Sequence, residues 1–329
     1  MRTLILLISI ITNIIAFSQT CNTDSIFHLG LDFFNGRNGK FMDREKGFNL
    51  QMEAAEMGNA DAQFEMGWFY SNGVYVEKND SIAFLWYDKA AMQGNAKAID
   101  NCGFSFINGI GIKKNISKAV ECFDRGAALN YPPSIFHLGV CYEKGDGVEQ
   151  NSERASQLFR QAAELGYGEA QYALACSYYL GRGKRRDYDS SFYWANLAFE
   201  KGVSDAANLA GVLCVDADPS KGLDYFKRGY EAGNINALRN YAKCLRDGTG
   251  CEPDVIKAAS IFEIGVNQDD IECTYDLGLL MYEGKVVVHI NGKPNTKQTK
   301  QKGLEFLIKC AKNGYEPAVS YCDSNKIKY

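Results

Sequence analysis

The feature that most limits the fold of this chain is an internal repeat with a period near 36 residues. Along the 329 residues a small residue, glycine or alanine, recurs at intervals of 37, 36, 36, 36, 36, 31 and 36. The recurring positions are Gly30, Gly67, Gly103, Gly139, Ala175, Gly211, Ala242 and Gly278. Such a period is typical of arrays in which each unit buries its apolar face against its neighbours. The repeat therefore predicts an array of about eight copies.

Each copy has the pattern of a helix pair. In the first helix an alanine, a Leu-Gly or Met-Gly pair and an aromatic residue share one arc, as Ala62, Met66 and Tyr70 do, and the glycine lets another helix approach closely. A glycine-rich loop follows. The second helix ends at a glycine such as Gly94. Its start is marked by a preferred N-cap residue, which is Asn79, Asn115, Asn151, Asp187 or Asp254. The pattern predicts an all-α fold, an α/α solenoid of eight hairpins in a right-handed superhelix.

The combined pattern resembles a known repeat family. Ala-x-x-x-Leu-Gly, then Gly-x-Gly-Val, then a capped Ala-x-x-[Trp/Leu]-[Tyr/Phe]-x-x-Ala-Ala-x-x-Gly is similar to the Sel1-like repeat, a relative of the tetratricopeptide repeat. The match is clear over 61–98 and 134–170 and weaker over 209–237. The resemblance implies a solenoid with a concave face that acts as an adaptor or scaffold. Residues 216–219 depart from it by shortening one loop, and 285–301 by inserting a segment in the last copy.

The first residues are typical of an export signal. Arg2 precedes a short apolar run, and Ala16 and Ser18 stand three and one positions before Gln19, so residues 1–18 are predicted to be a signal peptide. A short segment, 19–25, then leads into the array at 26–329. A lipid anchor on Cys21 is the less favoured alternative, because Gly or Ala is missing just before it. We expect a secreted, periplasmic or cell-envelope protein without a transmembrane segment after signal removal.

Composition and motifs exclude several function classes. With 36 basic and 40 acidic residues the net charge is −4, which does not suit nucleic-acid binding. The Gly-x-Gly loops follow no strand, so a phosphate cradle is not expected. Gly-x-Ser-x-Gly, Ser-x-x-Lys, His-Glu-x-x-His and Cys-x-x-Cys motifs are missing, so no catalytic residues, metal or cofactor are predicted.

The cysteines leave two interpretations open. There are 11, an odd number unless Cys21 is acylated. An oxidising compartment would favour disulfides, whereas small buried cysteines can also act as apolar core residues. The candidate pairs are Cys244 with Cys251, Cys310 with Cys322, and Cys141 with Cys176. Some cysteine-rich exported relatives of this repeat family are described as β-lactam-binding or β-lactam-hydrolysing proteins, but their cysteines recur eight residues apart, a spacing this chain does not keep. A β-lactamase-like envelope enzyme is therefore the less favoured alternative to a scaffold.

The candidate binding residues lie at fixed offsets from the repeat glycine. Positions two before, one after and five after it fall within about 60° of one another on a helix, opposite the apolar arc. In the first four copies these are His28, Leu31, Asn35, Glu65, Trp68, Asn72, Asn101, Phe104, Asn108, His137, Val140 and Lys144. We call these twelve residues the first-helix row. Aromatic anchors beside amides fit a protein partner or an extended peptide on the concave face. Alternatively, the apolar members pack repeat on repeat and the asparagines cap helix ends.

The sequence has three other polar features: acidic residues in the later copies, two histidines at equivalent positions, and the insert of the last copy. The later copies carry acidic residues at the same offsets: Asp216, Asp247, Asp276 and Glu283. His28 and His137 occupy the same Ile-Phe-His-Leu-Gly motif three copies apart, too far for a shared metal, so both are interpreted as polar groove residues. The insert contains an Asn-Gly turn signal and Pro294, which predicts either a short hairpin, a solvated loop or a docking element. His289 within it has no partner in the sequence.

Overall fold

The computed structural model describes residues 22–287, 289–290 and 293–329 of the chain. The predicted signal peptide, residues 1–18, and Cys21 lie outside the described residues. The chain divides into two compact units, a first unit that ends at Leu165 and a second unit that begins at Gly166. Each unit is considered by itself below.

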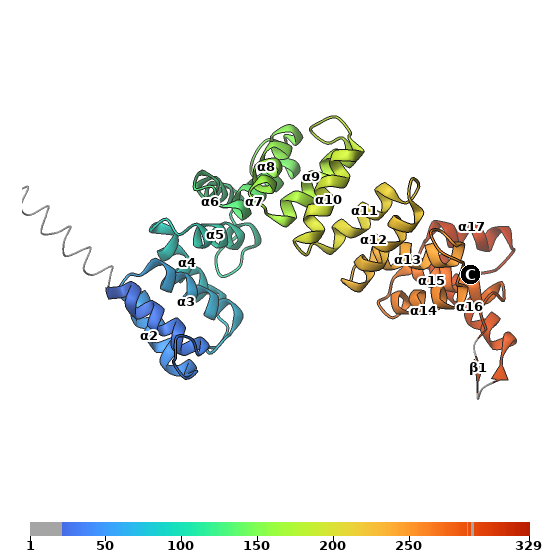
Figure 1. The fold of residues 1–329 in the computed structure, drawn as a ribbon, viewed down its shortest axis with the longest axis horizontal. Helices are drawn as coiled ribbons and strands as arrows, with labels where there is room; N and C mark the ends of the chain where they lie inside the picture. Colours follow the sequence, from blue (N-terminus) through green and yellow to red (C-terminus); the bar gives the residue numbers. More distant parts are fainter. Residues whose placement is uncertain (1–21, 288, 291–292) are drawn as a thin grey trace, which may run out of the picture. The chain divides into compact units, whose positions relative to one another are not determined.

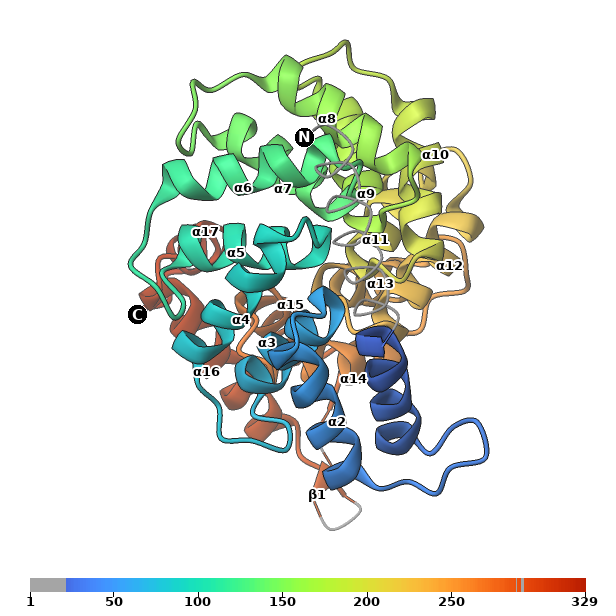
Figure 2. The same cartoon turned by 90° about the vertical axis from the view of Figure 1, so that its left-hand side faces the viewer.

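The described chain is all-α, built from consecutive helix hairpins, as predicted. Residues 22–35 are helical, so the helix already includes part of the segment 19–25 that the sequence placed before the array. The other helices of the first unit are α2 (Arg44–Glu56), α3 (Ala60–Asn72), α4 (Asp80–Met92), α5 (Ala96–Asn108), α6 (Ile116–Ala128), α7 (Pro132–Lys144) and α8 (Ser152–Glu164). Those of the second unit are α9 (Gly168–Leu180), α10 (Tyr188–Glu200), α11 (Ser204–Cys214), α12 (Pro219–Glu231), α13 (Ile235–Asp247), α14 (Val255–Val266), α15 (Ile271–Tyr282), α16 (Thr296–Lys312) and α17 (Glu316–Ser324). Within each unit successive helices pack side by side in chain order (Figures 1 and 2).

Side-chain caps start the second helices where the sequence placed them. Asn79 Oδ1 accepts from the Ile82 amide at 3.0 Å, and Asn115, Asn151, Asp187 and Asp254 do the same in their copies. Each cap satisfies one of the backbone N–H groups that the first turn of a helix leaves without an intrahelical partner. The fixed offset of these residues thus sets where each second helix begins.

A second set of caps, which the sequence reading missed, also links neighbouring copies. Asn95 Oδ1 caps its own helix α5 through the Ala98 amide at 3.0 Å, while its Nδ2 donates to Asp61 of α3 at 2.8 Å. The same bridge recurs as Asn59 to Asp24 at 2.6 Å and Asn234 to Asp205 at 2.6 Å. Each bridge joins the starts of two successive first helices. We call this set the cap bridges.

Four of the repeat glycines, Gly67, Gly103, Gly139 and Gly211, face an aromatic ring from the second helix of the same copy. A methyl group built on Gly103 would lie 2.5 Å from the ring of Phe123, and one on Gly67 would lie 2.4 Å from the ring of Tyr87. Phe123 is 1% exposed and Tyr87 is 6% exposed, so these rings form the centre of the hairpin core. This confirms the close helix approach that the glycines predicted.

The two irregular copies differ in how they absorb their changed length. In the shortened copy α11 ends at Cys214 and α12 starts at Pro219, capped by Asp218. In the last copy β1 (His289–Ile290) pairs antiparallel with β2 (Lys293–Pro294), so the insert contains a short hairpin. The insert was predicted to run to residue 301, but α16 already begins at Thr296. Asn295 sets this start by accepting from the Gln298 amide at 3.0 Å.

Candidate partner-binding surface

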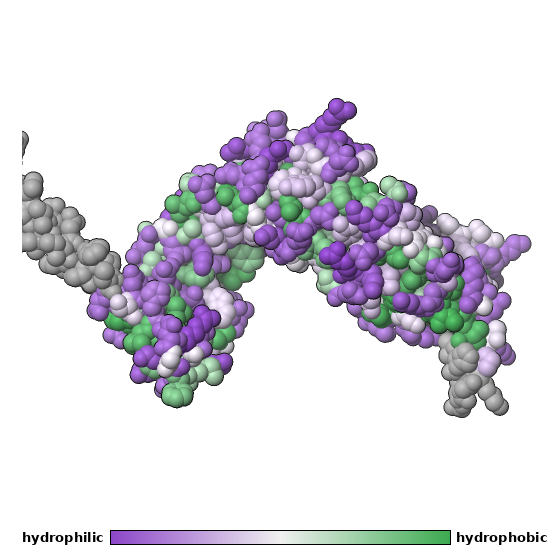
Figure 3. Space-filling model, viewed as in Figure 1, coloured by the Kyte–Doolittle hydropathy of each residue, from purple (hydrophilic) through white to green (hydrophobic). Residues whose placement is uncertain are grey.

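The first-helix row lies entirely in the first unit, on the helix 22–35 and on α3, α5 and α7. Its two aromatic members are unusually exposed for large apolar side chains: Trp68 is 41% and Phe104 is 48% exposed. Leu31 and Val140 are partly buried. Figure 3 shows apolar surface among hydrophilic residues on this unit. Aromatic side chains left in solvent are the usual anchors of protein interfaces.

The asparagines of the row bond back to their own helices. Asn35, Asn72 and Asn108 each donate from Nδ2 to a backbone carbonyl four residues earlier, at 2.9 Å. The accepting carbonyls belong to Leu31, Trp68 and Phe104, three of the four apolar members of the row. The amides therefore close the last turn of each helix, as one of the two interpretations expected. This bond fixes each side chain and leaves its Oδ1 acceptor for other groups.

The two histidines of the row differ in their surroundings. His28 is exposed. The Nδ1 of His137 lies 2.9 Å from Asp100 Oδ1, and Ser134 Oγ donates to that same oxygen at 2.8 Å. A serine, an aspartate and a histidine thus meet here, but Ser134 is fully buried and bonds the carboxylate rather than the imidazole. This arrangement links α7 to α5 and lacks the serine to histidine contact that a nucleophile needs.

The first two copies of the row share a pocket of about 400 Å³. Four predicted residues line it, namely Leu31, Asn35, Glu65 and Trp68. Residues that the sequence reading missed complete the wall: Phe34, Gln51, Phe64, Phe69 and Lys97. Among these five, Gln51 is the one that comes from a second helix, α2. The other eight row residues do not line this pocket.

Two polar groups of the pocket are poorly solvated. Gln51 is fully buried, and its Oε1 has no hydrogen-bond partner among the described residues. Burial raises the pKa of the Glu65 carboxyl, and the nearby Lys97 ammonium opposes that rise. A buried acceptor without a donor costs about 1–3 kcal/mol. The wall of this pocket therefore includes a buried acceptor without a donor and a carboxyl with a raised pKa.

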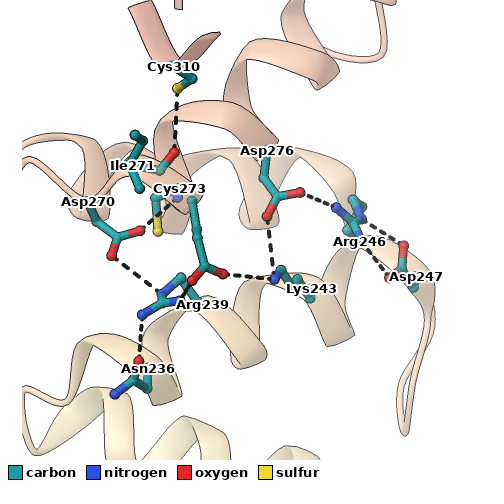
Figure 4. A network of polar contacts seen from close by, with 11 residues as sticks. Asn236, Arg239, Lys243, Arg246, Asp247, Asp270, Ile271, Cys273, Asp276 and Cys310 are labelled. Atoms are coloured by element: carbon teal, nitrogen blue, oxygen red, sulfur yellow. Dashed lines mark hydrogen bonds and ion pairs between the residues drawn. The ribbon is translucent and has the colours of Figure 1, made fainter. Parts of the chain in front are cut away.

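In the second unit, charged residues occupy the positions equivalent to the first-helix row, and they form ion pairs with one another and with their neighbours. Figure 4 shows Arg239, Lys243 and Arg246 of α13 facing acidic residues at the start and along the length of α15. Arg246 Nη1 donates to Asp276 Oδ1 at 2.7 Å, and Lys243 Nζ lies 3.8 Å from the other Asp276 oxygen. The remaining pairs join Arg239 with Asp270 and Glu272, Lys243 with Glu272, and Arg246 with Asp247. Of the acidic residues predicted at these offsets, Asp247 and Asp276 pair with Arg246, and Glu283 lies 2.9 Å from Lys285. Asp216 is exposed.

Asp276 is the most enclosed member of this network. It is 7% exposed, and burial raises the pKa of its carboxyl although Lys243 and Arg246 act in the opposite direction. The pKa of the exposed Asp247 is lowered, first by its hydrogen bond from Arg246. The network packs α13 against α15 and leaves few free charges for a partner.

A second pocket, of about 460 Å³, lies in the second unit between α14, α15 and the insert. Its walls include Ile256, Leu277, Met281 and Val286, with Lys285 and Lys302 among the polar lining residues. Figure 3 shows apolar surface in this region, next to the grey atoms of the insert.

The six cysteines proposed for pairing are free thiols in the structure. Cys251 Sγ lies 3.9 Å from the Cys244 carbonyl, and Cys310 packs in one apolar cluster with Cys322. Cys141 belongs to the first unit and Cys176 to the second. Most of the thiols occupy small-residue positions of the helix cores, so pairing under oxidising conditions stays a prediction.

Burial makes three of these thiols unreactive. It raises the pKa of Cys141, Cys244 and Cys310 from 9.0 to about 11. At pH 7.5 the thiolate fraction, and with it the alkylation rate, should fall about a hundredfold relative to the unfolded chain, since each pKa unit is tenfold. Iodoacetamide labelling of the reduced chain, followed by peptide mass spectrometry with and without guanidinium, measures this. Equal labelling rates in both conditions would contradict it.

Within the described residues no three histidine, cysteine or acidic side chains converge on a metal-sized site. In the same part of the chain, no helix combines the length and the apolar character needed to cross a bilayer.

Six stretches of the chain match the model of the Sel1 repeat: 60–95, 96–131, 132–167, 168–203, 206–234 and 235–270. The chain belongs to the Sel1 repeat family. Each matched Sel1 repeat corresponds to one hairpin, from α3 with α4 to α13 with α14. The helix pairs that precede residue 60 and follow residue 270 extend the array beyond these six repeats.

Solved Sel1 repeat structures are similar to this chain. A Sel1 repeat protein from Oxalobacter formigenes is 29% identical, with 72% of this chain and 95% of that chain covered and a TM-score of 0.63. A protective antigen of uropathogenic Escherichia coli with the same repeat fold is 24% identical, with 90% and 70% covered and a TM-score of 0.51. An immunity protein from Pseudomonas aeruginosa is 18% identical, with 64% and 82% covered and a TM-score of 0.43. No curated protein matches the sequence.

Proposed function

We propose that this Sel1 repeat protein is a non-enzymatic adaptor that holds an extended segment of a partner protein along the first-helix row. The observation that carries the proposal is the exposure of Trp68 and Phe104 at equivalent positions of successive copies. Interface hot spots are enriched in large aromatic side chains, and here the two recur at the same repeat position. The pocket beside Trp68 gives the segment a place to insert a side chain.

The polar neighbours of these anchors suit an extended backbone. Asn72 and Asn108 are held in place by their bonds to the Trp68 and Phe104 carbonyls, and each keeps an Oδ1 acceptor. Backbone N–H groups of an extended peptide need such acceptors, since they lose water on binding. Spacing by one repeat would place one anchor and one amide against each successive stretch of the partner.

The enzyme alternative has less support in the residues. A β-lactam hydrolase needs an activated nucleophile, and Ser134 is buried and bonded to Asp100 instead. The proposal also includes export to the cell envelope, on the basis of the predicted signal peptide over residues 1–18 and without a lipid anchor at Cys21.

Affinity capture from the native envelope tests the adaptor role. The double variant Trp68→Ala, Phe104→Ala should lose most of the captured partner, because each anchor contributes about 2 kcal/mol or more if it is a hot spot. The control is Leu85→Ala, Met92→Ala on α4, which removes two apolar side chains outside the row that are even more exposed, at 59% and 76%, and should leave capture unchanged.

Two results would contradict the proposal. Undiminished capture by a folded double variant would remove the row as the binding surface. Hydrolysis of a chromogenic cephalosporin well above blank by the purified chain would favour the enzyme instead.

A further inference from the structure

We infer that the pocket between the helix 22–35, α2, α3 and α5 is a recognition site for an arginine side chain of the bound segment. This inference rests on the proposed function and names the residue that the partner would insert. It starts from the balance of hydrogen-bond donors and acceptors on the pocket wall. The lining residues come from three successive first helices and from α2, all within the first unit.

Acceptors outnumber donors in this pocket. Gln51 Oε1 is buried without a partner, because the amide uses its Nε2 to reach the Gly47 carbonyl at 3.3 Å. Asn35 donates from Nδ2 to the Leu31 carbonyl, which leaves its Oδ1 as an acceptor. Within the described part of the chain no donor bonds the Glu65 carboxylate. The Gln51 and Asn35 amide oxygens and the Glu65 carboxylate therefore have no protein donor in this part of the chain, and the lining side chains that carry an unused N–H donor are Lys97 and Trp68.

The aromatic walls favour a cation as that donor. Phe34, Phe64 and Trp68 line the same pocket as these acceptor groups. The Lys97 ammonium already lies 5.7 Å from the centre of the Phe64 ring, which shows that a cation is accepted against this wall. A planar guanidinium can stack on aromatic faces and donate in several directions at once, whereas an ammonium is a compact and more strongly hydrated charge. These properties select arginine over lysine.

The pocket volume agrees with one side chain as the occupant. About 400 Å³ is at the lower end of the range for ligand pockets, roughly 300–1,000 Å³. The partly buried Glu65 supplies the opposite charge. Lys97 is the one unfavourable group, because its positive charge repels an incoming cation. Removal of the Lys97 charge should therefore strengthen the binding of a cation, which is the opposite of what removal of the Glu65 charge should do.

Calorimetric titration of the purified chain with short peptides tests this inference. The probes are acetyl-Ala-Ala-Xaa-Ala-Ala-amides in which Xaa is Arg, Lys, norleucine or Glu. We expect the arginine peptide to bind most tightly. Glu65→Gln should weaken it about tenfold, which corresponds to ~1.4 kcal/mol. Lys97→Met should strengthen it several-fold, because the competing charge is gone. The control is Glu121→Gln on α6, outside the pocket, which should change nothing.

Each other result overturns the inference. Equal binding of the norleucine peptide would make this an apolar pocket. A preference for the glutamate peptide, together with weaker binding by Lys97→Met, would make Lys97 the recognition group. Absence of binding by every peptide would remove the site. If the arginine peptide fails while the Trp68, Phe104 double variant still loses its captured partner, the adaptor role stands and only the arginine site is wrong.

Discussion

Arg246→Met is expected to lower the free energy of unfolding by about 3 kcal/mol, the lower end of the cost of removing one partner from a buried ion pair. The substitution keeps the aliphatic length of the side chain but takes the guanidinium from Asp276, which is 7% exposed. Lys243, 3.8 Å away, then remains as its one nearby cation of the network. The cost stays at the lower end because Arg246 itself is 26% exposed and solvent screens part of the interaction.

Urea unfolding at neutral pH measures this effect. The matched control is Lys227→Met in the same unit, whose ion pair with Glu231 is 3.9 Å long between two side chains that are 52% and 57% exposed. Exposed pairs of this kind contribute about 0–1 kcal/mol. Equal losses in the two variants would show that the network around Asp276 is not specially stabilising.

Acidification should reduce the difference in unfolding free energy between the parent chain and Arg246→Met. Burial already raises the pKa of Asp276 in the folded chain, and removal of the guanidinium raises it further. A folded acid with a raised pKa binds more protons than its unfolded form, so the penalty is full above the raised pKa and shrinks as the pH falls through it. A deficit that stays constant on acidification would point to lost packing instead of an unpaired carboxylate.

Phe123→Ala is expected to lower the free energy of unfolding by about 3–5 kcal/mol, as large-to-small changes of buried aromatic residues do. Phe123 is 1% exposed and its ring fills the space that Gly103 leaves open. Gly103→Ala alone should also destabilise, by about 1–3 kcal/mol, because its methyl group would lie 2.5 Å from the ring.

The effect of Gly103→Ala on the free energy of unfolding should change sign when Phe123 is also replaced by alanine. Without the ring, the methyl group at residue 103 has space, and alanine is better than glycine in a helix by about 1 kcal/mol. Gly103→Ala should therefore stabilise the Phe123→Ala variant although it destabilises the parent. Denaturant unfolding of the four chains measures the coupling. Additive effects would mean that glycine is not required by the ring.

The sequence predicted the hairpins well because their signals are local. Asn79 and its counterparts cap the helices that they were expected to start, and the repeat glycines allow the close helix approach that was expected of them. The extent of the insert was wrong at its end, because Asn295 starts α16 while the comparison with other copies counted residues 296–301 as inserted. A cap can extend a helix backwards beyond the repeat pattern, and the pattern carries no sign of it.

The candidate site was only partly predictable. Four residues chosen by their offsets within the first helices, Leu31, Asn35, Glu65 and Trp68, line one pocket, and their role in binding stays a prediction. The offsets could not find Gln51, which lies on α2, the second helix of the first copy, whereas the row contains only positions of first helices. They also could not decide the bonding of the asparagines, because an amide at the end of a helix can equally bond to its own backbone or to a partner.

The cap bridges have a consequence for how such an array can change in length. Asn234 reaches Asp205 across 29 residues, whereas Asn95 reaches Asp61 across 34, yet both bonds form with nearly the same length. The shortening falls at the end of α11, which has 11 residues where α9 has 13, and in the loop before α12, while the bridge between the starts of α11 and α13 is kept. Insertions and deletions in these loops should therefore be tolerated without shifting one recognition position relative to the next, so natural variants and engineered linkers can alter a loop while the partner still finds its contacts in phase.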